Sequence, residues 1–217
     1  MPQIDFGGHT DVADKFLESI KSVYSNADKK LSEKGIKPAL PRKIRLRELP
    51  GKIGFEKYMK KEKGKLYVFV VPNVQKVFGY YDPVKDEAVI DPILLKDTEF
   101  SKIMKEYGLK MRQPSLTEVL AEETIVHKLQ KDAGAIDKSG KYKYGREAIE
   151  GLAGALKEYL GIDVVAYPYE TCVMKKILKE SGISPTDSLY GGHKKDIYGE
   201  FSARAADCYE RGKCSCS

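Results

Sequence analysis

The chain has 217 residues, enough for one large domain or two small ones with a sizeable core. Charged residues make up 32% and hydrophobic residues 41%, a balance typical of a globular protein rather than of a disordered or membrane-embedded chain. The net charge of +6 permits binding to nucleic acid without requiring it. The first residues lack a secretory signal pattern and the longest apolar run, residues 66–72, is too short to span a bilayer, so we expect a cytoplasmic protein without a membrane partner.

Hydrophobic periodicity predicts a helix followed by strands in the first part of the chain. Thr10 can cap a helix that runs to about Lys34, because apolar residues recur there every three or four positions. Apolar runs then predict strands at 43–49, 65–71, 79–82 and 88–91, the last two joined by a turn. The basic stretch Lys57–Lys65 is predicted to be a solvated loop, with a nucleic-acid patch as the alternative.

The second part of the chain is predicted to be mainly helical. Helices are expected at Ile93–Tyr107, Leu116–Gln130, Arg146–Leu160 and Thr171–Ser181. From residue 184 the chain becomes rich in Gly, Ser, Asp and Lys, which predicts irregular structure with a short helix near Phe201–Cys208. We therefore expect an α+β fold, with a small, mostly antiparallel sheet packed on helices in residues 1–183 and a Cys-containing extension in residues 184–217.

The predicted helix Leu116–Gln130 carries a carboxylate and an imidazole on its apolar face. Glu123 and His127 are four residues apart, so their side chains meet on that face. An unpaired polar group buried there costs roughly 2–7 kcal/mol, so a partner, a water molecule or a metal ion has to compensate it. One interpretation is an ordinary helix ion pair, and another is a metal site completed by Glu150 from the next helix.

These two helices resemble those of gluzincin-type zinc metallopeptidases, especially their small, minimal-domain members. The family has HExxH on one helix and a Glu ligand in a Glu-Gly-x-Ala context on the next; here Leu-Ala-Glu-Glu-Thr-Ile-Val-His-Lys-Leu-Gln (residues 120–130) precedes Glu150-Gly-Leu-Ala. The resemblance covers roughly residues 40–182, and residues 79–91 are similar to the edge hairpin that borders the family's substrate cleft. It implies a zincin-like fold, zinc held by Glu123, His127 and Glu150, and a peptide along the edge strand.

Two positions depart from the family pattern. Glu123 stands where HExxH has its first His, and Thr124 stands where it has the general-base Glu, although a hydroxyl is too weak a base at neutral pH. Moving the match by one residue makes Glu122 the ligand and Glu123 the base, but ligands five residues apart need π-helical backbone.

The sequence therefore favours a metallopeptidase-like protein with impaired or absent hydrolytic activity, a pseudoenzyme that keeps a peptide-binding fold. Whether it is an enzyme stays open at this point, because Thr124 occupies the base position in the direct match. The alternative is a basic binding or structural protein, associated with nucleic acid, in which Glu123 and His127 only pair with each other.

Three of the four cysteines, Cys208, Cys214 and Cys216, crowd the C-terminal tail. Their spacing is not that of a zinc ribbon, so we predict a disulfide between Cys172 and one of them, with free thiols or a four-sulfur metal site as alternatives. Intracellular disulfides are ordinary in hyperthermophiles, and abundant Lys and Glu without Trp are compatible with a thermophilic source.

Overall fold

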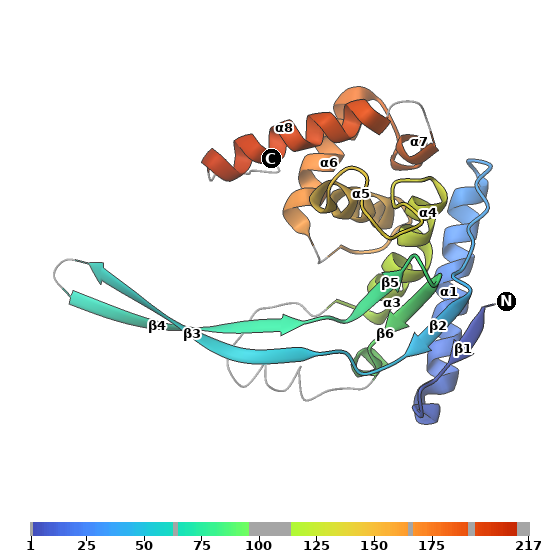
Figure 1. The fold of residues 1–217 in the computed structure, drawn as a ribbon, viewed down its shortest axis with the longest axis horizontal. Coiled ribbons are helices and arrows are strands. Elements are labelled where there is room, and N and C mark those ends of the chain that lie inside the picture. Colours follow the sequence, from blue (N-terminus) through green and yellow to red (C-terminus); the bar gives the residue numbers. More distant parts are fainter. Residues whose placement is uncertain (1, 63–64, 96–113, 165–166, 191–193, 212–217) are drawn as a thin grey trace.

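The computed structural model describes residues 2–62, 65–95, 114–164, 167–190 and 194–211. For residues 52–62, 65–75, 168, 194–196 and 206–211 the description covers the backbone alone. The fold is α+β: strands and one long helix come first, and a set of helices follows in the C-terminal half (Figure 1). No helix in these ranges is long and apolar enough to cross a membrane.

A four-stranded mixed sheet organises the N-terminal half. Its strands lie in the order β1 (Gln3–Asp5), β2 (Lys43–Leu46), β6 (Glu87–Ile90) and β5 (Gly79–Asp82). The pairs β1–β2 and β2–β6 are parallel and β5–β6 is antiparallel, so the prediction of a mostly antiparallel arrangement was wrong for this sheet. The predicted strands did not include β1, and helix α1 (Ala13–Ser32) forms the crossover that a parallel β1–β2 pair requires.

A long antiparallel hairpin separates β2 from β5 in the chain. Its strands, β3 (Gly51–Glu62) and β4 (Lys65–Lys76), are each 12 residues long and extend away from the sheet in Figure 1. The predicted strand 65–71 is confirmed within β4, whereas the predicted loop at Lys57–Lys65 was wrong, because most of that stretch belongs to β3. The alternative prediction, a nucleic-acid patch at Lys57–Lys65, depends on side chains that lie outside the described ones.

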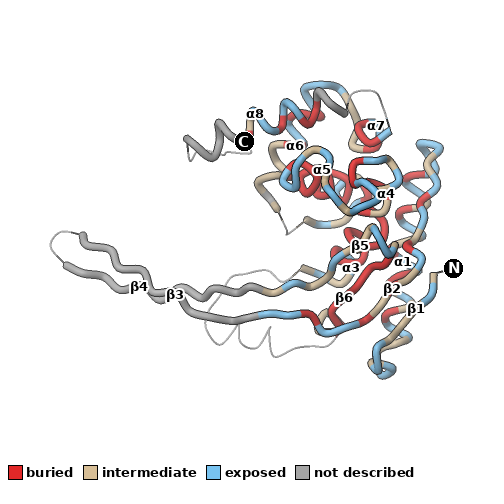
Figure 2. Tube along the Cα trace, in the orientation of Figure 1, coloured by how far each residue is buried: buried red, intermediate tan, exposed pale blue. Residues whose placement is uncertain are grey.

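The remaining helices pack against the sheet and against one another. The elements in chain order are η1 (Thr10–Val12), α1, η2 (Pro92–Leu95), α3 (Leu116–Leu120), the π-helical segment η3 (Ala121–Val126), α4 (His127–Asp132), α5 (Arg146–Tyr159), α6 (Pro168–Ser181), α7 (Pro185–Tyr190) and α8 (Lys194–Arg211). Buried positions concentrate along β6, η3 and α5, which together form the centre of the molecule (Figure 2). Most of the predicted helix Ile93–Tyr107 lies outside the described residues.

The C-terminal extension is helical where irregular structure was predicted, and the expected short helix is part of the longer α8. The buried residues Ile197, Tyr198, Phe201 and Ala205 recur at helical spacing and belong to the same core as α5 and α6. The polar and Gly-rich composition around them obscured this apolar stripe. Cys172 on α6 is disulfide-bonded, as predicted. The side chains of Cys208, Cys214 and Cys216 lie outside the described ones, so the choice among these partners stays a prediction.

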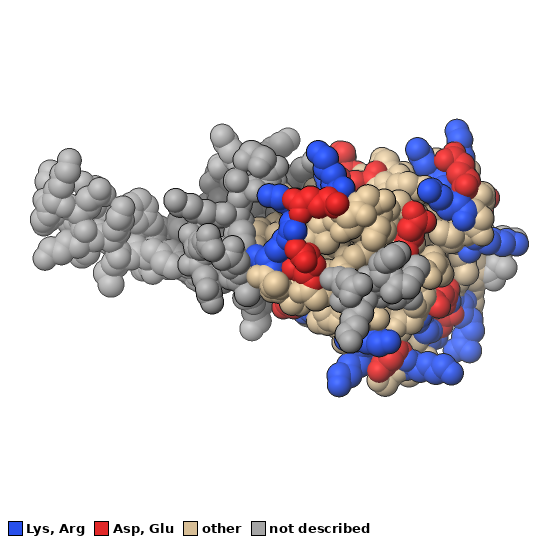
Figure 3. Space-filling model, turned by 90° about the horizontal axis from the view of Figure 1, so that it is seen from above, with Lys and Arg blue, Asp and Glu red and all other residues tan. Residues whose placement is uncertain are grey.

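Charges on one face of the molecule are mixed rather than segregated. On the face shown in Figure 3, Lys and Arg side chains lie beside Asp and Glu instead of forming one continuous basic surface. Lys128 pairs with Asp132, for example, and Arg204 pairs with Glu200. This part of the surface therefore lacks the single-sign field that a nucleic-acid interface uses.

Helices α5 and α6 approach closely because glycine stands at their contact. A Cβ atom placed on Gly154 would lie 1.8 Å from the hydroxyl oxygen of Thr171, and one placed on Gly151 would lie 2.6 Å from the carbonyl oxygen of Glu170. Any larger side chain would therefore push the two helices apart. This contact fixes the position of α5, which carries Glu150.

We predict that Gly154→Ala destabilises the protein by about 1–3 kcal/mol through overpacking against Thr171. Gly199→Ala is the matched control, because Gly199 lies within α8 and a Cβ atom there meets nothing within 4 Å. It should stabilise the protein by about 0.5–1 kcal/mol, the ordinary helix preference for Ala over Gly. Urea unfolding of both variants measures the difference, and equal effects would contradict the packing argument.

Candidate metal centre

The helix that follows the sheet changes its hydrogen-bond pattern in its middle. Between α3 and α4, the segment Ala121–Val126 is π-helical. A π-helical turn is wider than an α-helical turn, so residues five apart, here Glu122 and His127, project on the same side. The hydroxyl of Thr124 points elsewhere, since it donates a hydrogen bond to the carbonyl oxygen of Leu120 at 2.6 Å.

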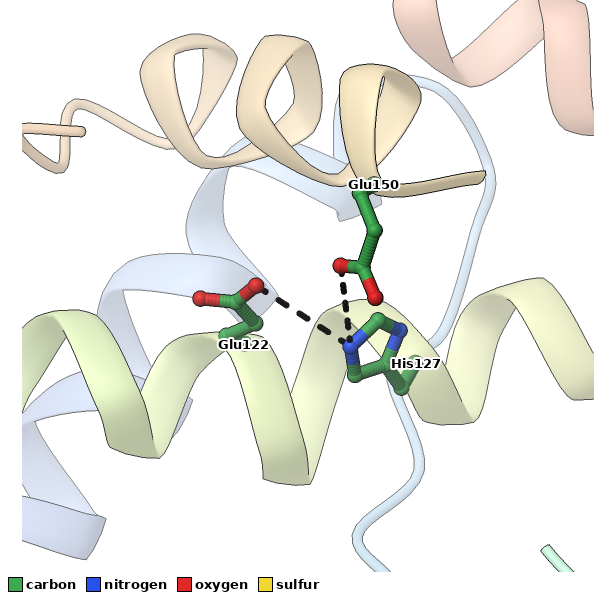
Figure 4. Close-up of side chains that lie close together, drawn as sticks. All are labelled: Glu122, His127 and Glu150. Carbon is green, nitrogen blue, oxygen red and sulfur yellow. Dashed lines mark ion pairs between the residues drawn. The ribbon is translucent and has the colours of Figure 1, made fainter. Parts of the chain in front are cut away.

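Four buried side chains converge at this point. His127 Nε2 lies 4.0 Å from Glu122 Oε1, 3.9 Å from Glu123 Oε2 and 3.8 Å from Glu150 Oε2. Figure 4 shows Glu122 and His127 on one helix and Glu150 on α5, with their polar ends pointing toward one another. The structure thus brings together the three residues that the sequence analysis singled out, Glu123, His127 and Glu150, and adds Glu122.

The arrangement identifies which of these residues suit a metal ion. Within the described residues, Glu122, His127 and Glu150 each offer a ligand atom, and those atoms all lie within 4.8 Å of one another. This buried group can hold a metal ion. The ligand set differs from the direct match to HExxH, which used Glu123, and agrees with the match moved by one residue. The signal in the sequence was the adjacent pair Glu122-Glu123, but only π-helical backbone makes the first of the two face His127.

The imidazole of His127 is oriented by Gln130. Gln130 donates from Nε2 to the carbonyl oxygen of Ile149 at 2.8 Å, and its Oε1 lies 2.7 Å from His127 Nδ1. Because Oε1 can only accept, Nδ1 carries the hydrogen. In the neutral ring the lone pair is then on Nε2, the nitrogen that faces the carboxylates. Metal-ligating histidines are held by this kind of second hydrogen bond.

The two carboxylates that could hold a metal ion, Glu122 and Glu150, each have their two oxygens in different surroundings. Glu122 turns Oε1 toward His127, and its Oε2 accepts a hydrogen bond from Lys157 Nζ at 2.5 Å. Glu150 turns Oε2 toward His127, and its Oε1 lies 3.5 Å from Arg146 Nε. Each carboxylate therefore presents one oxygen to the centre of the group, while a cation holds the other.

Burial and crowding of like charges shift the pKa values in this group. Burial, together with the nearby carboxylates, raises the pKa of Glu123 to about 8 although the imidazole opposes the shift. Burial lowers the pKa of His127, but the three surrounding carboxylates outweigh burial and the net pKa lies above its usual value. Burial also raises the pKa of Glu150. Without a cation the group therefore retains protons near neutral pH, and a divalent ion would displace them.

The group opens into a cavity of about 350 Å³ that β5 borders. Residues from β5 and its approach, Phe78, Gly79, Tyr80 and Tyr81, line one wall of the cavity. Tyr142, Arg146 and Tyr167 also line the cavity. Gly79 allows the strand to lie this close, because a Cβ atom there would be 2.6 Å from Val119 Cγ1 and 3.1 Å from Glu123 Cγ. A ligand on β5 would therefore lie beside the carboxylates.

Comparisons of the chain with protein-family models, with curated proteins and with solved structures found no match. The resemblance to gluzincins rests on the motif residues alone. The geometry of the group itself, from its ligand atoms to the cavity beside them, is therefore the basis for assigning its chemistry.

We predict that the metal-free protein loses stability as the pH rises from about 5 to about 9. The reason is that Glu123 and His127 both have a higher pKa in the folded than in the unfolded state, and that of folded Glu123 is about 8. A group that binds its proton more tightly in the folded state contributes stability at low pH and loses it as the pH rises through the folded pKa. Urea unfolding across this interval, with and without saturating Zn²⁺, measures the effect.

Zinc should abolish this loss of stability, because it takes over the role of the protons. Glu123→Gln is the matched variant, since it keeps the shape and neutrality of the protonated carboxyl group, and it should show a shallower loss without zinc. A metal-free protein whose stability rises over the same interval would show that the carboxylates are not held in their protonated form.

Proposed function

We propose that the protein is a zinc-dependent, metallopeptidase-like protein that binds an extended peptide along β5 and hydrolyses it slowly. The observation that carries the proposal is the convergence of Glu122, His127 and Glu150 beside an edge strand, with His127 Nε2 turned inward by Gln130. The resemblance of the two helices to those of gluzincins, and a zincin-like architecture for the α+β fold, belong to this proposal.

The donor set favours zinc over calcium or magnesium. Zinc accepts imidazole nitrogen and carboxylate oxygen, and catalytic zinc sites use three protein ligands with one side open, as the cavity here provides. Calcium takes six to eight oxygen ligands, whereas Glu122 and Glu150 each turn one oxygen inward and the third donor is a nitrogen. When bound, zinc polarises a carbonyl group and activates water.

Glu123 supplies the proton-transfer group. Its carboxylate lies 3.9 Å from His127 Nε2 and lines the same cavity, so it can reach a water molecule or a leaving group there. A general base works best with a pKa near the working pH. Burial raises the pKa of Glu123, and a bound divalent ion would lower it again. In the match moved by one residue, Glu123 stands at the family's general-base position, and Thr124 is occupied with the backbone.

The charge of the ligands accounts for slow hydrolysis. Two carboxylates neutralise a divalent ion in full, whereas the two imidazoles and one carboxylate of the family pattern leave a positive charge. Less positive charge means weaker polarisation of a carbonyl group. The expectation of impaired activity thus remains, with Glu122 as its physical reason in place of Thr124.

The peptide-binding part of the proposal rests on the position of β5. It is the last strand in the order β1-β2-β6-β5, and among the described residues nothing pairs with its outer edge. Unpaired backbone N–H and C=O groups on an edge strand can bind an extended peptide through main-chain hydrogen bonds. The exposed ring of Tyr80 and the side chain of Val77 lie at this edge and offer apolar contacts.

We predict slow cleavage of an unstructured fluorogenic peptide that requires Zn²⁺ and stops with a chelator. Glu123→Gln should lower the rate by roughly 10²–10⁴-fold, the usual contribution of a general base, with zinc still bound. His127→Ala should abolish both cleavage and zinc binding.

Thr124→Val is the matched control, because it keeps the size of the side chain and removes the hydroxyl that bonds to Leu120. It should leave the rate unchanged per folded molecule. Cleavage that survives Glu123→Gln, or that is lost in Thr124→Val while zinc binds normally, would contradict the assignment of Glu123 as the base.

A further inference from the structure

We propose that Lys157 is a positioning residue that fixes the orientation of the Glu122 carboxylate and offsets part of its negative charge at the metal site. The inference rests on the metal site of the proposed function. It concerns a residue on α5 that neither the motif nor the ligand geometry assigns.

Lys157 is buried among the residues of the core. It is 1% exposed, and it lies seven residues after Glu150, two turns along the same face of α5. Its Nζ lies 2.5 Å from Glu122 Oε2 and 3.4 Å from Glu118 Oε1, and Glu118 is also 1% exposed. Glu118 and Glu122 are one helical turn apart, so the ammonium group lies between two carboxylates on the side of Glu122 away from His127.

Stability alone does not explain this buried cluster. Removing an ammonium group from water costs several kcal/mol, and replacing a buried ion pair by apolar residues of similar volume is often neutral or stabilising. Leu or Met could fill the space between α3 and α5 without that cost. The position of the ammonium group directly behind a metal ligand points to a role in that ligand's geometry and charge.

Lys157 acts on Glu122 in two ways. It binds Oε2, which leaves Oε1 as the oxygen turned toward His127 and fixes the carboxylate in one orientation. Its positive charge also offsets part of the negative charge of Glu122, the remainder being shared with Glu118. A carboxylate whose charge is partly offset in this way is closer in charge to the neutral imidazole at the first HExxH position. Lys157 therefore reduces the loss of positive charge at the ion that a second carboxylate ligand causes.

The test is a double-mutant cycle on zinc affinity, measured by competition with a chromophoric chelator. Lys157→Met, which keeps the length of the side chain, should weaken zinc binding by about 10–100-fold, the usual effect of removing a group that orients a metal ligand. In a Glu122→His background, where the ligand is already neutral, Lys157→Met should leave the affinity unchanged or increase it. The absorption spectrum of bound Co²⁺ reports the geometry in each variant.

Lys175→Met is the matched control, because Lys175 pairs with Glu158 between α6 and α5 at the surface and should not affect zinc affinity. If Lys157→Met does not fold, Glu118→Gln with Lys157→Met removes the second buried carboxylate as well, and it should show the same weakening. Weakening by an equal factor in both backgrounds, or none in the wild-type background, would overturn the role of Lys157. A wild-type protein that binds no zinc would instead overturn the metal site itself.

Discussion

The π-helical turn at Ala121–Val126 is the constraint on which the site depends. In a regular α-helix Glu122 and His127 would point in different directions, because residues five apart do not share a face. The wider turn brings Glu122 to His127 and keeps Glu123 beside them, while Thr124 bonds back to the carbonyl oxygen of Leu120. π-helical insertions are rare and occur frequently at functional sites, so the local geometry and the clustered chemistry support the same interpretation.

Compensation of buried charge is the second organising feature. Three buried carboxylates around one imidazole would repel one another if nothing neutralised them. Lys157 holds one ligand from the interior and Arg146 approaches the other from the solvent side, so each carboxylate keeps one oxygen for the centre. Without a metal ion, the negative charge that these cations leave uncompensated helps to raise the pKa values of Glu123 and His127. A single divalent cation would balance this charge, which is why the group resembles a metal site more than an ion pair.

Part of this could be predicted from the sequence. The helical period placed Glu123 and His127 on one apolar face, and the match to Glu-Gly-x-Ala pointed to Glu150 on the next helix. Glu122 as a candidate ligand was accessible only as an alternative, because a π-helical turn leaves no mark in the apolar period. Lys157 was hidden for a different reason: a lysine in an amphipathic helix ordinarily faces solvent, and only the packing of η3 against α5 buries it. The strand β3 was missed because its basic residues favoured a loop.

The most direct measurement is a crystal structure of the protein soaked with Zn²⁺, with anomalous diffraction recorded on both sides of the zinc edge. The account predicts one buried anomalous peak, about 2.0–2.2 Å from His127 Nε2, Glu122 Oε1 and Glu150 Oε2. The Glu123 carboxylate should lie outside bonding distance and the π-helical turn should be retained. A peak bonded to Glu123 in place of Glu122 on a regular α-helix, or no peak at this group in zinc-soaked crystals, would contradict it.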